Sequence, residues 1–320
     1  MSCVSAVSAF EALAGRGHDV VPVGIDRSGV FHLADLRHRP LAAEGPVVEL
    51  AVPGGDLVGG GGRISYDVAF PVLHGPFGED GTIQGLFEMA AVPYVGSGVL
   101  GSAAAMDKDV AKRLFRDAGL PTTAFATVRR GPFRADPEAA VEVAAAVGLP
   151  AFVKPAALGS SVGITRVEDR SGLEAALGVA FEFGPKAIVE AASTGREIEV
   201  AVLEGPRASV PGEIVVEGGW YTYDAKYRDD ATRLLVPAPL VEEAAAEVRR
   251  MAMLAFEAVE GAGLARVDFF YEEGGRGFLL NEVNTMPGFT PKSMFPMMWA
   301  ASGMPYDELC DELVGLALAR

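Results

Sequence analysis

Residues 153–163 of the chain read VKPAALGSSVG, and this stretch decides how the middle of the sequence folds. A short apolar strand delivers Lys154 to a loop of small residues. Gly159 and Gly163 let backbone amides approach a phosphate closely, and the two hydroxyls between them add hydrogen-bond donors. An ordinary Gly- and Ser-rich hairpin turn is the alternative, and this stretch alone does not separate the two. It is not a P-loop, because the Gly-Lys-Ser/Thr ending of that motif is absent.

Two apolar strands near the C-terminus carry charged side chains in a regular pattern. Alternation along a strand places Arg266 and Asp268 on one face of the first. It likewise places Glu282 and Asn284 on one face of the second. If these strands pair, two carboxylates and an amide oxygen converge, and such oxygen ligands suit Mg²⁺ ions that bridge phosphates. A surface salt-bridge ladder is the alternative, but strands that are otherwise apolar would then bury charge without a purpose.

The N-terminal part of the chain alternates between helix and strand, a pattern typical of a parallel α/β sheet. The predicted elements are a helix over 3–14, strands at 20–25, 68–73 and 93–95, and a helix over 82–90. Pro71 weakens the second strand because proline donates no ladder hydrogen bond. This strand ends at His74, and α/β sheets usually place functional loops at that edge.

A helix over 102–119 contains Lys108, and residues 122–190 then follow a β-α-β-β-α-β order that predicts a small α+β unit. The remaining predicted elements are a strand at 198–203, a long helix over 240–262, strands at 265–271 and 278–283, and short helices. We therefore expect three units, with boundaries at residues 1–103, 104–190 and 191–320.

The charge of the chain limits the classes of function. A formal net charge of −16 argues against a nucleic-acid binder and against a polybasic membrane anchor. An anionic ligand would need a local cluster of cations to overcome this field. The six lysines are Lys108, Lys112, Lys154, Lys186, Lys226 and Lys292.

Two cysteines far apart in the sequence predict neither a disulfide framework nor a metal site. The sequence contains no apolar run of the ~18 residues that a membrane span needs, and no signal peptide is recognisable at its start. We expect a cytoplasmic protein.

Taken together, the motifs resemble one family, the D-alanine:D-alanine ligases and the related D-alanine:D-lactate ligases. The matching stretches are 73–75, 78–85, 93–98, 106–108, 153–163, 223–227, 265–268 and 281–290. The resemblance implies an ATP-grasp fold, in which a Rossmann-like pre-ATP-grasp domain without its first strand precedes a two-part ATP-grasp α+β region. It implies that ATP phosphorylates the carboxylate of one D-alanine. The amine of a second D-alanine then attacks the acyl phosphate, which gives D-alanyl-D-alanine for peptidoglycan.

The resemblance also implies a role for particular residues. For ATP, it implies Lys108 and Lys154 at the phosphates, Lys226 at the γ-phosphate, Ser161, and Glu190 and Glu197 at the adenosine. For metal, it implies two Mg²⁺ ions, or Mn²⁺ in their place, on Asp268, Glu282 and Asn284. For catalysis, it implies Arg266 and the Gly288 amide at the tetrahedral oxyanion, and Ser160 and Tyr227 on a lid loop. For the substrate, it implies Ser293 at the carboxylate of the second D-alanine, and His74. A homodimer is implied as well.

Residues 223–227, which read YDAKY, favour the dipeptide-forming branch over the depsipeptide-forming branch. The chain departs from the family at its start, where the first strand, a glycine turn and a glutamate at the first D-alanine subsite have no counterpart. A start codon ~20–30 residues upstream is the preferred explanation, from usual strand and loop lengths. A shortened, ATP-binding paralogue with impaired turnover is the alternative. A third hypothesis is a ligase with another second substrate, such as D-lactate.

Overall fold

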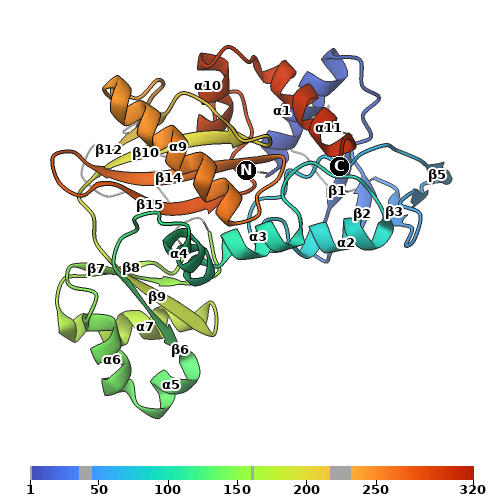
Figure 1. Cartoon of the computed structure of the whole chain (residues 1–320). Helices are drawn as coiled ribbons and strands as arrows, with labels where there is room; N and C mark the ends of the chain where they lie inside the picture. Colours follow the sequence, from blue (N-terminus) through green and yellow to red (C-terminus); the bar gives the residue numbers. More distant parts are fainter. Residues whose placement is uncertain (1, 36–44, 160–161, 217–231) are drawn as a thin grey trace.

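The computed structural model describes residues 2–35, 45–159, 162–216 and 232–320. Figure 1 shows three parts that succeed one another along the chain, with the middle part projecting from the other two. Within the described ranges, no helix is both long enough and apolar enough to cross a membrane.

The first part combines helices with a small antiparallel sheet. Its elements are α1 (Ser2–Gly15), β1 (Val23–Ile25), β2 (Phe31–Leu33), β3 (Val47–Leu50), β4 (Leu57–Gly59), β5 (Gly62–Ile64), α2 (Thr82–Ala90) and α3 (Val99–Met106). The five strands pair in chain order and every pair is antiparallel. The predicted helix over 82–90 is confirmed.

The expectation of a parallel sheet in this part is wrong for the strands that form. The predicted strands at 68–73 and 93–95 do run side by side in parallel, but they share a single bridge between Ala69 and Tyr94. Pro71 lacks the N–H that would extend the pairing past this bridge. The chain therefore reaches His74 in an extended form without a regular strand.

The predicted helix over 102–119 is two helices, because the chain bends at Asp107. α3 ends at Met106, and α4 (Lys108–Asp117) starts directly after the bend. The Asp107 carboxylate accepts the backbone N–H groups of Asp109 and Val110, both at 3.1 Å, and so caps the new helix. Such a cap stabilises a helix start by about 1 kcal/mol. As a result Lys108 is the first residue of a helix and not a residue in the middle of one.

The second part is a four-stranded sheet with helices on one face, as the β-α-β-β-α-β pattern predicted. Its elements are β6 (Phe125–Arg129), α5 (Arg130–Ala135), α6 (Pro137–Ala145), β7 (Ala151–Pro155), β8 (Thr165–Val167), η1 (Arg170–Gly172), α7 (Leu173–Glu182) and β9 (Lys186–Ala191). The strand order is β6-β9-β7-β8. Val153 and Val189 point into the core beneath α6 and α7. Alternation therefore places Lys154 and Glu190 together on the opposite face.

The third part is a larger sheet with helices on both faces. Its elements are β10 (Arg196–Leu203), β11 (Arg207–Ala208), β12 (Gly212–Val216), β13 (Thr232–Leu235), α9 (Glu242–Ala258), β14 (Leu264–Glu272), β15 (Gly277–Asn284), α10 (Met294–Ala301) and α11 (Tyr306–Leu318). The predicted long helix and the two C-terminal strands are confirmed within a few residues at each end.

Two hydrophobic cores lie on opposite faces of this sheet. Val200 and Val267 belong to the core under α9 and α4, whereas Ala201 belongs to the core under α10, α11 and α1. Arg266 and Asp268 flank Val267 in β14, so alternation turns them away from α9. The polar residues of the third part therefore emerge on the face that carries α10 and α11.

Candidate active site

The two C-terminal strands pair in the register that brings the predicted polar residues together. β14 and β15 are antiparallel, with Asp268 opposite Glu282 and Arg266 opposite Asn284. Glu199 of β10 lies opposite Asp268 on the other side of β14, and it extends the group by one strand. The strand pairing that was predicted to bring Asp268, Glu282 and Asn284 together is confirmed.

Arg266 is the centre of this group. Its Nε and Nη2 donate to the two carboxylate oxygens of Asp268, each at 2.7 Å, and its Nε lies 3.2 Å from Glu199 Oε1. Burial alone would lower the pKa of the guanidinium. The charges of Asp268 and Glu199 outweigh burial and raise the Arg266 pKa well above its ordinary value. The arginine is a fixed positive charge, and its planar fork orients the Asp268 carboxylate.

The donor set predicted for a metal consists of two carboxylates and an amide. Asn284 Oδ1 accepts the backbone N–H of Met286 at 3.0 Å, which fixes the direction of that side chain. In the described part of the chain, no group of three or more His, Cys, Asp or Glu side chains is placed to hold a metal ion. The set fits Mg²⁺ by ligand chemistry, because these are hard oxygen donors.

Lys108 joins the second and third parts at this point. Its Nζ donates to the carbonyl oxygen of Leu158 at 2.8 Å, in the loop after β7. The same Nζ lies 3.6 Å from Glu282 Oε2 on β15. The side chain is nearly buried, and the helix break at Asp107 is what directs it between the two sheets.

Lys154 and Glu190 face each other across neighbouring strands of the second part. Lys154 Nζ donates to Glu190 Oε2 at 3.2 Å. The fully buried Lys112 of α4 lies 3.5 Å from the same oxygen, and Thr123 donates to it at 3.4 Å. Burial would raise the pKa of Glu190, but the charges of Lys112 and Lys154 lower it below its ordinary value, so the carboxylate is ionised.

His74 is held by hydrogen bonds on both ring nitrogens. Nδ1 lies 3.0 Å from the carbonyl oxygen of Met286, and Nε2 lies 3.1 Å from the hydroxyl of Ser5. Ser5 also accepts the backbone N–H of Phe289 at 3.3 Å. Burial lowers the pKa of His74, so the ring is neutral near pH 7. Because a carbonyl only accepts, Nδ1 carries the proton and Nε2 accepts from Ser5.

Gly288 lies in the loop after β15, between Met286, whose carbonyl oxygen contacts His74, and Phe289, whose N–H donates to Ser5. A Cβ on Gly288 would come within 3.2 Å of Ser293 Oγ, so the absence of a side chain permits this close approach. Ser293 Oγ accepts the Thr290 N–H at 3.1 Å and lies 2.9 Å from Thr290 Oγ1. These contacts fix the Ser293 hydroxyl at the start of α10.

Not every predicted site residue is placed in this group. Ser160, Ser161, Lys226 and Tyr227 lie outside the described residues. Glu197 lies on β10 opposite Phe270 of β14, two residues before Glu199 and on the same face. Its assignment to the adenosine stays a prediction.

Sequence reasoning missed five residues that the fold places here. They are Ser5, Glu79, Lys112, Thr123 and Glu199. Glu79 Oε1 lies 3.8 Å from His74 Nδ1, and burial raises the pKa of Glu79. A rare lysine on an amphipathic helix was the available signal for Lys112, whereas Ser5 carries no local signal.

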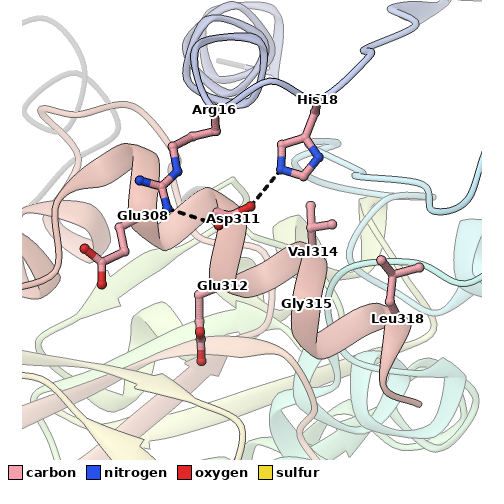
Figure 2. A pocket seen from close by; sticks show the side chains of 8 residues that line it. All are labelled: Arg16, His18, Glu308, Asp311, Glu312, Val314, Gly315 and Leu318. Atoms are coloured by element: carbon pink, nitrogen blue, oxygen red, sulfur yellow. Dashed lines mark hydrogen bonds and ion pairs between the residues drawn. The ribbon is translucent and has the colours of Figure 1, made fainter.

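The hollow between α1 and α11, of about 470 Å³, lies elsewhere. Figure 2 shows Arg16 and His18 pointing toward Asp311 across this hollow. The His18–Asp311 distance is 2.7 Å and the Arg16–Asp311 distance is 3.1 Å, so Asp311 already has partners for both carboxylate oxygens. All three side chains are more than one third exposed, so solvent screens these pairs. The convergent polar groups are at β14 and β15, not in this hollow.

A family model described as "D-ala D-ala ligase N-terminus" matches residues 1–97, and one described as "D-ala D-ala ligase C-terminus" matches residues 114–315. The chain belongs to the D-alanine–D-alanine ligase family. The ATP-grasp fold expected from the sequence is thereby confirmed.

The similarity to individual members of this ligase family extends over the whole chain. A D-alanine–D-alanine ligase of Pseudarthrobacter chlorophenolicus is 47% identical over 347 residues, which cover 100% of this chain and 91% of the relative. The structure of D-alanyl-alanine synthetase A from Vibrio cholerae has a TM-score of 0.87 at 30% identity and covers 100% of this chain and 94% of its own. VanG D-Ala:D-Ser ligase from Enterococcus faecalis has a TM-score of 0.86 at 34% identity, covering 98% and 94%.

Proposed function

We propose that the chain joins two D-alanines in an ATP-dependent reaction that yields D-alanyl-D-alanine for peptidoglycan. The observation that carries this proposal is the position of Lys108 between the loop after β7 and Glu282 of β15. This position supports a site in which the Lys108 ammonium, between the second and third parts, binds a phosphate. The family membership supplies the chemistry: ligases of this kind couple ATP to D-alanine condensation.

The reaction proceeds in two steps that balance. A carboxylate oxygen of the first D-alanine attacks the γ-phosphorus of ATP, and ADP leaves. The amine nitrogen of the second D-alanine then attacks the acyl carbon, an amide bond forms, inorganic phosphate leaves and the amine gives up a proton. Phosphoryl transfer of this type depends on positioning and charge neutralisation. The lysines between the second and third parts supply local positive charge in a chain whose net charge is −16.

Each predicted residue has a role in this proposal. Lys108, Lys154, Ser161 and Lys226 contact the phosphates, and Glu190 and Glu197 contact the adenosine. Arg266 and the Gly288 amide stabilise the tetrahedral oxyanion, which preorganised donors achieve at low cost. Ser293 and His74 position the second D-alanine, and Ser160 and Tyr227 close the site. Two Mg²⁺ ions, or Mn²⁺ in their place, would sit on Asp268, Glu282 and Asn284 and neutralise phosphate charge.

The experiment is phosphate release from ATP by the whole chain with Mg²⁺, with and without D-alanine, and the product is identified by its mass. The proposal expects D-alanine-dependent release and a D-alanyl-D-alanine mass, with L-alanine inactive. Dipeptide formation would exclude the alternative of an ATP-binding paralogue without turnover. An absence of D-alanine-dependent release would refute the proposal.

The similarity to a D-Ala:D-Ser ligase favours one second candidate, a ligase with another second substrate. D-Serine and D-lactate offered together with D-alanine test it. A mixed product in excess over D-alanyl-D-alanine would favour this candidate. We also propose a homodimer, for which light scattering should give twice the chain mass of 33.4 kDa.

A further inference from the structure

Lys112 is a lysine that no solvent or ligand can reach directly. It lies on the buried side of α4 with a relative exposure of 0%. Its Nζ lies 3.3 Å from Thr123 Oγ1 and 3.5 Å from Glu190 Oε2. A charged lysine is rarely buried to this degree without a paired charge, and here the paired charge is Glu190.

Two lysines, Lys112 and Lys154, contact the single negative charge of Glu190. Lys112, Lys154 and Thr123 all contact the same oxygen, Oε2. The other oxygen, Oε1, is buried and has no hydrogen-bond partner among the described residues. A buried carboxylate oxygen without a donor calls for a ligand that supplies one. An N–H or O–H group of a nucleoside has that chemistry.

The two lysines differ in their access to a ligand. The Lys112 side chain is 1% exposed, whereas the Lys154 side chain, near the end of β7, is 12% exposed. Lys154 can therefore turn toward a phosphate, and Lys112 cannot. If Lys154 were the only counter-ion of Glu190, its departure would leave a buried carboxylate uncompensated, which is strongly unfavourable.

We propose that Lys112 is a positioning residue that acts as a fixed counter-ion of Glu190 and so releases Lys154 to bind the phosphates of the nucleotide. Through the shared Oε2 contact, Lys112 also holds Oε1 toward the donor of the nucleoside. This inference rests on the proposed function for the presence of ATP in the site. It goes beyond that function because it assigns Lys112 a role that acts only through Glu190.

The test measures ATP binding to the full chain by calorimetry, which does not require turnover. Lys112→Met should raise the ATP dissociation constant by about tenfold or more, since about 1.4 kcal/mol corresponds to each factor of ten. The KM for D-alanine should stay within about twofold of the wild-type value, because the substitution affects only nucleotide binding. Lys186→Met is the matched control, because Lys186 is also a largely buried lysine, with a side chain 12% exposed, but pairs with Asp107 and Asp109. It should leave ATP affinity unchanged.

A second comparison separates positioning from a merely structural role. Glu190→Gln removes the carboxylate, so Lys112→Met in that background should change ATP affinity by less than about twofold. The double variant lacks both charges of the Lys112–Glu190 pair. It can therefore be measured even if Lys112→Met alone does not fold. An equal loss of affinity from Lys112→Met in both backgrounds would overturn the inference.

The pH dependence gives an independent readout. Without Lys112, the Glu190 pKa should rise, because one of the lysine charges that lower it is gone; Lys108 and Lys154 remain nearby. As the pH falls, Glu190 becomes neutral and frees Lys154, so the ratio of variant to wild-type dissociation constants should shrink. A ratio that is large and constant with pH would contradict the mechanism.

The outcomes for this inference and for the proposed function are distinguishable. Wild type that binds ATP but makes no dipeptide refutes the proposed function and leaves the calorimetric comparison valid. Wild type and Lys112→Met with equal ATP affinity refute the inference alone. Wild type that does not bind ATP refutes both.

Discussion

Replacing Ser5 by alanine tests whether α1 holds the loop that contains Gly288. The Ser5 hydroxyl accepts the Phe289 N–H at 3.3 Å and donates to His74 Nε2, whose distance is 3.1 Å. Since His74 Nδ1 donates to Met286 O at 3.0 Å, the loop is held on both sides of Gly288. Ser5→Ala removes one of the two attachments.

The size of the effect follows from burial. Ser5 is 0% exposed, so alanine leaves the buried Phe289 N–H and the part-buried His74 ring nitrogen without this partner. Each unsatisfied group costs about 1–3 kcal/mol, and the pair should cost about 2–4 kcal/mol after relaxation. At about 2 °C per kcal/mol for a chain of this length, the melting temperature should fall by about 4–8 °C. A loop displaced by about 1 Å should lower kcat by tenfold to a hundredfold.

The assay combines a melting curve with D-alanine-dependent phosphate release. Ser8→Ala is the matched control, because Ser8 lies on the same helix and its hydroxyl only donates to Val4 O at 3.3 Å on the exposed side. The control should behave as wild type. The KM for ATP should be unchanged in Ser5→Ala, because the lysines proposed to contact the nucleotide lie on other elements. Wild-type melting and wild-type kcat in Ser5→Ala would refute the reasoning.

Three further predictions concern the β14–β15 strand pair and the residues 286–289 that follow it. Asp268→Asn should abolish phosphate release, as should removal of divalent metal by EDTA; undiminished release in either case would remove Asp268 from a metal site. Gly288→Ala should lower kcat/KM for D-alanine at least tenfold with a small change in melting temperature, because its Cβ would lie 3.2 Å from Ser293 Oγ. Burial lowers the pKa of His74 below its ordinary 6.5, so the unfolded chain binds the proton more readily and stability should fall as the pH drops below 6.5. Denaturation midpoints of His74→Gln should fall less over that range; an equal fall would exclude His74 as the cause.

The strand pair β14–β15 was predictable because its information is local. Alternation alone puts Asp268 and Glu282 on defined faces, and only the register had to come from the structure. The middle part was predictable for the same reason, since strand and helix patterns alternate cleanly along residues 122–190.

The N-terminal part was harder because its pairing is decided by tertiary contacts. Helix–strand alternation predicted parallel strands, but short segments between glycines and prolines formed an antiparallel sheet. The break at Asp107 was also missed, although an Asp before a helix is a known start signal. Apolar residues on both sides made the longer helix the simpler interpretation.

The site residues that sequence reasoning missed act across long distances in the chain. Ser5 meets Phe289 across 284 residues, and nothing near Ser5 in the sequence distinguishes it from Ser8. Lys112 meets Glu190 only because α4 packs beneath the sheet of the second part. Hydrogen bonds of this kind follow from packing, so they were visible only in three dimensions.

The central claim is that D-alanine is activated as an acyl phosphate, and oxygen transfer tests it most directly. D-Alanine labelled with ¹⁸O in its carboxylate is incubated with the chain, ATP and Mg²⁺, and the released phosphate is weighed by mass spectrometry. The account predicts that each phosphate released carries one oxygen from D-alanine, in step with dipeptide formation. Phosphate that carries no label while dipeptide forms would contradict it.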